Sequence, residues 1–140
     1  RRFVDDLRSE AYALSREAVP FLEQQTTAED RKSVAGLRRT ASQTRLTTLL
    51  MDAVAWLALL DPQRPDKRAM SLATRVAANE AQNLGDLEPA LANLIHRVVN
   101  FHRRLENIEM RLDRGSSAYP DDGAAAPVLV SASSPSPTKA

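Results

Sequence analysis

The sequence predicts an all-α protein, an antiparallel helical bundle of three long helices plus one shorter helix, followed by a disordered C-terminal tail. Two observations predict this class. Ala and Leu supply 40 of the 60 hydrophobic residues, whereas Val and Ile supply 11, and β-branched residues are the ones that favour strands. Apolar residues also recur at spacings of three and four over most of residues 1–114, which is the period of a helix face.

The first helix is predicted over about residues 2–24. One face carries the apolar side chains of Leu7, Ala11, Leu14, Ala18 and Leu22. Pro20 interrupts this pattern, because a proline lacks the N–H that an interior helical position requires. The helix is therefore either kinked at Pro20 or ended there.

The second helix is predicted over about residues 28–60. From Leu46 to Leu60 only Thr47, Thr48 and Asp52 are polar, which is typical of a helix buried at the centre of a bundle. This apolar stretch has fifteen residues, too few for a bilayer, which needs about 20. Asp61-Pro62 ends the helix, because the residue before a proline disfavours the helical conformation.

A weaker third helix is predicted over about residues 66–84, with the face Met70, Ala73, Ala77, Ala81 and Leu84. Its small side chains bury little apolar area, so docking on the rest of the bundle would have to stabilise it.

The last helix is predicted over about residues 88–113 and has the most regular stripe. Its gaps alternate between three and four through Leu91, Leu94, Val98, Phe101, Leu105, Ile108 and Leu112. This heptad pattern indicates near-parallel helix packing. Ile95, Val99 and His102 form a partial second stripe, which either widens the internal core or faces a partner.

The chain divides into a helical bundle domain, residues 1–114, and a Ser/Pro-rich tail, residues 115–140. The tail has six Ser, four Pro and two Gly among 26 residues, a composition that cannot bury enough apolar surface to fold. Its apolar island, Val128-Leu129-Val130, is a candidate partner-binding motif.

The composition provides few groups for catalysis. The chain has no Cys, so a zinc-thiolate site or a cysteine nucleophile is excluded. His96 and His102 are six positions apart and do not share a helix face, and the four Gly form no phosphate-binding loop. We therefore predict a protein that is not an enzyme and has no cofactor or metal, with each His a surface or seam residue.

Charge is distributed unevenly although the formal net charge is only +1. Arg103 and Arg104 belong to a group of arginines in the last helix and are candidate partner-binding residues. Interleaved acidic residues favour a solvated face over a phosphate-contacting one. Asp52, inside the apolar half of the second helix, is either at a solvated edge or a buried registry or interface group paired with an Arg or Thr of another helix.

The segment from Arg45 to Leu57 resembles the core helix of the regulator of CtrA degradation (RcdA-like) family. The signature residues are Arg45, Leu46, Thr47, Thr48, Met51, Trp56 and Leu57. Glu10 to Leu14 is similar to the first helix of that family, and Leu105 to Arg114 is similar to its last helix. Residues 61–86 match least.

The resemblance implies a non-enzymatic adaptor that helps deliver selected substrates to the ClpXP protease in cell-cycle-regulated proteolysis. The implied partners are proteins: a ClpX unfoldase primed by a response regulator, protease substrates, a cyclic-di-GMP-sensing adaptor and a second copy in a homodimer. Neither nucleic acid nor membrane is an expected partner. The implied location is the cytoplasm, concentrated at a cell pole.

Two alternatives stay open at this point. The second stripe of the last helix also fits a structural dimerisation module without a proteolytic role. The arginine groups fit, less well, a nucleic-acid-associated regulator, because no aromatic residues are interleaved with them to stack on bases.

Overall fold

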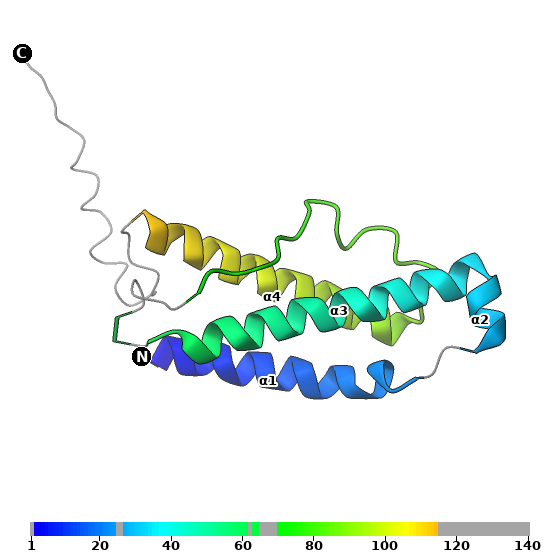
Figure 1. Ribbon diagram of the computed structural model, residues 1–140, viewed down its shortest axis with the longest axis horizontal. Coiled ribbons are helices and arrows are strands. Elements are labelled where there is room, and N and C mark those ends of the chain that lie inside the picture. Colours follow the sequence, from blue (N-terminus) through cyan, green and yellow to red (C-terminus); the bar gives the residue numbers. More distant parts are fainter. Residues whose placement is uncertain (1, 25–26, 62, 65–69, 115–140) are drawn as a thin grey trace, which may run out of the picture.

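The computed structural model describes residues 2–24, 27–61, 63–64 and 70–114. Figure 1 shows three long helices and one short helix: α1 (Arg2–Leu22), α2 (Ala28–Lys32), α3 (Val34–Leu59) and α4 (Pro89–Asp113). No β-strand occurs in these ranges, so the all-α prediction is confirmed for the described part of the chain. Residues 115–140, which include the predicted disordered tail, lie outside it.

The helix ends follow local backbone chemistry. The predicted helix 28–60 is interrupted at Ser33, whose Oγ accepts a hydrogen bond from the Gly36 N–H at 2.9 Å and thereby caps α3. Pro20 lies inside α1, which continues to Leu22, so Pro20 does not end that helix. Pro89 occupies the first turn of α4, where no helical N–H is needed.

The predicted helix over residues 66–84 is not present in the described part of that range. Residues 70–87, which we call the strap, contain turns but no helix. The strap runs along α3 and α4 to the start of α4 (Figure 1). Its small Ala side chains offer little area to bury, and its backbone groups are instead bound by side chains of the neighbouring helices.

The strap changes the direction of the last helix. A bundle with four alternating helices was predicted to be antiparallel throughout, but α3 and α4 run in the same direction, and α1 runs opposite to both (Figure 1). Side-chain pairs agree with this arrangement. Arg38 near the start of α3 binds Asp86 just before α4, whereas Asp52 further along α3 meets His102 further along α4.

One hydrophobic core joins all three long helices and the strap. The entire predicted heptad stripe of α4 is buried in it. Ile95, Val99 and His102 are buried as well. Of the two interpretations of the second stripe, the structure therefore supports the one in which it widens the core. The other buried apolar side chains are Val4, Leu7, Ala11, Leu14, Ala18, Leu46, Leu49, Leu50, Ala53, Trp56, Leu57, Leu60, Leu72 and Leu87. None of the described helices is long and apolar enough to cross a membrane.

Candidate functional site

One side of the bundle exposes a row of apolar residues on α3. Met51, Ala55, Ala58 and Leu59 are exposed at helical spacing, so they share one face. The side chain of Met51 is 66% exposed and that of Leu59 is 52% exposed. The prediction that this half of the helix is buried all round is therefore wrong for this face.

Tyr12 of α1 extends this row across the junction with α3. Tyr12 is 55% exposed, and it lines a groove of about 300 Å³ together with Arg8, Ala11, Val54, Leu57 and Ala58. We call the exposed residues Tyr12, Met51, Ala55, Ala58 and Leu59 the α1–α3 face. A shallow apolar groove beside exposed large side chains is the kind of surface that receives an amphipathic helix or an apolar peptide.

Arg8 fixes the end of α3 at the edge of this groove. Its Nε donates to the Leu57 carbonyl at 2.9 Å, and its Nη2 donates to the Leu60 carbonyl at 2.7 Å. No basic residue lies in the last turn of α3 itself. A guanidinium from α1 therefore satisfies the terminal carbonyls of α3 and complements the negative end of its dipole.

The signature residues divide between the core and the surface. Leu46, Trp56 and Leu57 are buried. The hydroxyls of Thr47 and Thr48 each donate to the backbone carbonyl four residues earlier, at 3.0 Å. Packing and local hydrogen bonding account for these five positions, whereas Met51 is exposed on the α1–α3 face.

Arg45, the first signature residue, ties α3 to the strap. Its Nε and Nη2 donate to the Glu80 carboxylate at 2.7 and 3.0 Å, and Nη2 also donates to the Arg75 carbonyl at 2.9 Å. The hydrogen bond from Arg45 lowers the pKa of Glu80, and the same bond raises the pKa of Arg45. This forked contact holds the middle of the strap against the first half of α3.

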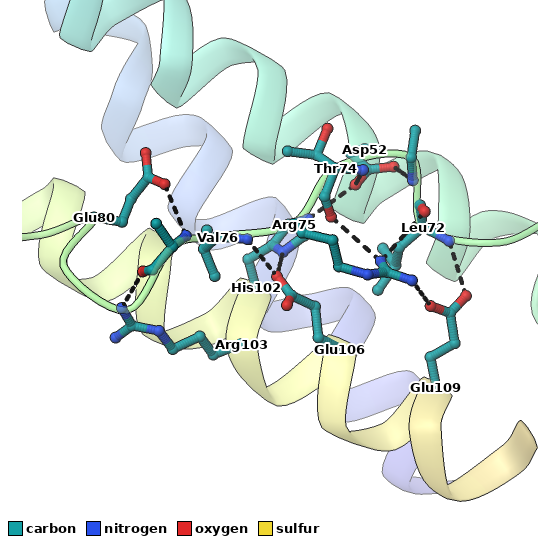
Figure 2. A network of polar contacts seen from close by, with 12 residues as sticks. Asp52, Leu72, Thr74, Arg75, Val76, Glu80, His102, Arg103, Glu106 and Glu109 are labelled. Atoms are coloured by element: carbon teal, nitrogen blue, oxygen red, sulfur yellow. Dashed lines mark hydrogen bonds and ion pairs between the residues drawn. The ribbon is translucent and has the colours of Figure 1, made fainter. Parts of the chain in front are cut away.

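Asp52 is buried in a polar network between α3, α4 and the strap (Figure 2). Its Oδ2 lies 2.9 Å from Nε2 of His102, and Nδ1 of the same ring lies 2.7 Å from Oε2 of Glu106. The solvated-edge interpretation of Asp52 is therefore wrong. Asp52 is buried, and its partners are a His and backbone amides rather than an Arg or a Thr side chain.

The carboxylates of this network bind the backbone of the strap. Asp52 accepts hydrogen bonds from the N–H groups of Ala73 and Thr74 at 2.8 and 3.0 Å. Glu106 accepts from the Val76 N–H at 3.0 Å, and buried Glu109 accepts from the Leu72 N–H at 2.9 Å. These bonds replace the hydrogen bonds that a helix would have supplied to the same amides.

The candidate partner-binding residues of α4 are engaged within the chain. Ile95 and Val99 are buried beneath the strap, where they line a cavity of about 220 Å³ with Glu80 and Leu84. Arg103 donates to the carbonyls of Ala77 and Ala78 at 2.8 and 3.0 Å.

Arg104 pairs with Glu10 of α1 and lies over the Phe101 ring. In the isolated chain, these four residues of α4 therefore stabilise the bundle. The last candidate motif, Val128-Leu129-Val130, lies outside the described residues.

The polar network was not predicted from the sequence, and His102 was assigned to the surface or to a seam between helices. A signal was present, because His102, Glu106 and Glu109 follow each other at spacings of four and three and so share one face of α4. Figure 2 shows these three side chains directed at the strap. These three residues lie beside a heptad stripe, and the apolar half of the second helix carries a single Asp. Together these two features could have indicated a buried polar network.

The network holds no group of three metal-ligating side chains arranged for a metal ion, nor does any other described part of the chain. Neither the curated proteins nor the solved structures include a match to this chain. A family model does match, over residues 1–131, and its description is "Protein of unknown function (DUF1465)". Since this match spans nearly the whole sequence, the chain belongs to the DUF1465 family.

Proposed function

We propose that this chain is a non-enzymatic adaptor that helps deliver selected substrates to the ClpXP protease. The resemblance of Arg45–Leu57 to the core helix of the RcdA-like proteins motivates the proposal. The observation that carries it is the α1–α3 face, which places an exposed apolar row on that same helix. The fold requires Leu46, Trp56 and Leu57 for its core, but it does not require an apolar residue at the exposed Met51 position.

The chemistry of the α1–α3 face fits a protein partner. Exposed apolar side chains beside a groove lose water when an apolar partner surface docks, and burial of such side chains dominates the binding energy of many interfaces. The proposed partners are the primed ClpX unfoldase, protease substrates, a cyclic-di-GMP-sensing adaptor and a second copy in a homodimer. A cytoplasmic location, concentrated at a cell pole, belongs to the same proposal.

The tail has a separate role in this proposal. Residues 115–140 would carry a short linear motif, Val128-Leu129-Val130, that contacts some of the cargo. A chain that ends at residue 114 should then keep its helical content but deliver part of its cargo more slowly. Unchanged delivery of every cargo would reduce the tail to a spacer.

A pull-down tests the adaptor role directly. Purified full-length chain is immobilised and offered ClpX that has been primed by its response regulator, alone and with candidate substrates. We expect wild type to retain at least one of them and Met51→Asp to lose it. Met110→Asp is the matched control, because Met110 is an exposed methionine of α4 that lies outside the α1–α3 face. No association of wild type with either component would reject the proposal.

The α1–α3 face also fits the alternative function, a plain dimerisation module, because this face could bind a second copy of the chain. The two functions separate when self-association and unfoldase binding are measured on the same variants. A dimerisation module would lose self-association with Met51→Asp while wild type binds no component of the protease.

A further inference from the structure

The strap is bound to the bundle through backbone amides and carboxylates, and His102 lies at the centre of these contacts. The amides of Ala73 and Thr74 are held by Asp52, and the amide of Val76 is held by Glu106. The His102 ring lies between these two carboxylates and is completely buried (Figure 2).

The donors and acceptors around His102 indicate which protonation state of the ring fits this geometry. Oδ2 of Asp52 accepts from the Thr74 N–H, and Oε2 of Glu106 accepts from the Val76 N–H. The same two oxygens face the two ring nitrogens of His102. Backbone N–H groups can only donate, so both oxygens accept from the strap. With both carboxyl groups ionised, both ring nitrogens must then donate. A neutral imidazole has one N–H and can satisfy only one of the two carboxylates.

We propose that the strap is held by a proton-dependent latch, in which doubly protonated His102 bridges Asp52 and Glu106 and loss of its proton releases residues 73–76. When the ring becomes neutral, one nitrogen presents a lone pair to a carboxylate at hydrogen-bond distance. The two carboxylates then face each other across a ring without charge. Both carboxylates accept hydrogen bonds from strap amides, so these bonds weaken when the two carboxylates move apart.

The charged groups around the latch provide no mobile cation to replace the proton. From α3, Arg45 acts electrostatically on Glu106, but its donors bind Glu80 and the strap carbonyl of Arg75. From the strap, Arg75 pairs with Glu109 at 2.8 Å.

On α4, Arg103 binds strap carbonyls, as described above. From α1, the charges that meet α4 are Glu10 and Glu17, each paired at the surface with an arginine of α4. The His102 ring is therefore the positive group in direct contact with Asp52 and Glu106.

Release of the strap would uncover an apolar surface. The apolar floor beneath it is lined by Leu46, Leu49, Ile95, Val98 and Val99. The strap residues Glu80 and Leu84 and the α3 residues Arg38, Ala41, Ser42 and Arg45 line the rest of the cavity. A partner would gain fuller access to Ile95 and Val99 if the strap moved away. Glu80 and Leu84 lie beyond the released residues and Arg45 holds Glu80, so the latch frees one end of this cover.

Hydrogen exchange and ring NMR test the latch on the full chain. ¹⁵N spectra of the histidine rings report how many nitrogens carry protons, and exchange protection, corrected for intrinsic rates, is measured at residues 73–76 between about pH 6 and about pH 9. We expect two protonated nitrogens on His102 at the acid end. Protection of the strap amides should fall about tenfold or more as that proton is lost, because a charged hydrogen bond is broken.

The two histidines of α4 provide a matched pair of variants. His102→Gln should lower strap protection at the acid end to the level that wild type reaches at the basic end, and should abolish its pH dependence. His96→Gln, at an exposed position, should behave as wild type. A singly protonated His102 ring at the acid end would overturn the latch. So would a ring that keeps both protons until the whole domain unfolds, or strap protection that does not change with pH. These wild-type results decide the question even if His102→Gln fails to fold.

Discussion

Asp52 and His102 lie on neighbouring parallel helices, fifty positions apart in the chain, with Oδ2 and Nε2 separated by 2.9 Å. The pair fixes the register of α3 against α4, and through two amide bonds Asp52 also fixes the strap. A parallel pair of helices joined by a long segment has no short loop to set its register. Buried polar contacts of defined geometry can serve that purpose.

Removal of the Asp52 charge should destabilise the whole domain. Asp52→Asn keeps the shape of the side chain but removes one of the two carboxylates that contact buried His102, so we expect a loss of about 2–4 kcal/mol in the free energy of unfolding. Urea denaturation followed by circular dichroism measures this loss. Asp6→Asn, at an exposed position of α1, is the control and should change stability by less than about 0.5 kcal/mol. Equal stabilities of the two variants would show that Asp52 is not a buried registry group.

Arg8 should be required for the end of α3. Arg8→Gln removes the forked donor that binds the carbonyls of Leu57 and Leu60, with an expected cost of about 1–2 kcal/mol. Exchange protection in the last turn of α3 should fall more than protection elsewhere. Arg16→Gln is the matched control, because Arg16 is exposed on the same helix. A uniform effect along α3, or none at all, would argue against the capping role.

The Arg45–Glu80 pair predicts a defined acid sensitivity. Because Arg45 lowers the folded-state pKa of Glu80 below its ordinary value of 4.5, the pair stabilises the folded chain above that pH. The contribution is lost as the pH falls through the lower folded-state value. Glu80→Gln should therefore cost about 1 kcal/mol at neutral pH, a size typical of a partly exposed forked pair. It should also reduce the loss of stability between about pH 5 and about pH 3. Denaturation curves measured at these pH values give the comparison. If Glu80→Gln and wild type lose the same stability between them, the assignment is contradicted.

Loss of the Trp56 indole nitrogen should cost less folding stability than loss of the side-chain volume. Nε1 is the single buried side-chain N or O atom without a hydrogen-bond partner in the described part of the chain. Trp56→Phe therefore breaks no hydrogen bond and should cost about 1–2 kcal/mol, whereas Trp56→Ala leaves a cavity and should cost about 3–5 kcal/mol. Thermal unfolding of the two variants gives the comparison. Similar losses would mean that an unrecognised polar contact holds the indole.

Periodicity predicted the three long helices well, because each has a continuous apolar stripe that packs against the others. The ends of α4 were placed within one residue, since Pro89 and the last apolar residue of the stripe mark them. The break at Ser33 was not predicted, because residues 29–33 are all polar and carry no apolar stripe that would show where a helix ends. Only the cap geometry separates α2 from α3.

The strap could not be predicted from its own residues. Residues 70–87 have apolar and Ala positions that fit a helix as well as an extended segment. The choice depends on Asp52, Glu106 and Glu109, which accept the strap amides from positions more than twenty residues away. The direction of α4 was wrong for the same reason, because an extended return brings the chain back to the start of α3.

The central claim is that this protein promotes proteolysis by binding other proteins through the α1–α3 face. The most direct measurement is the degradation rate of candidate substrates in a reconstituted ClpXP reaction with the primed unfoldase. Wild type should accelerate degradation of at least one substrate, Met51→Asp should lose that acceleration, and Met110→Asp should retain it. Degradation rates that are the same with wild type, with Met51→Asp and without the protein would contradict the claim.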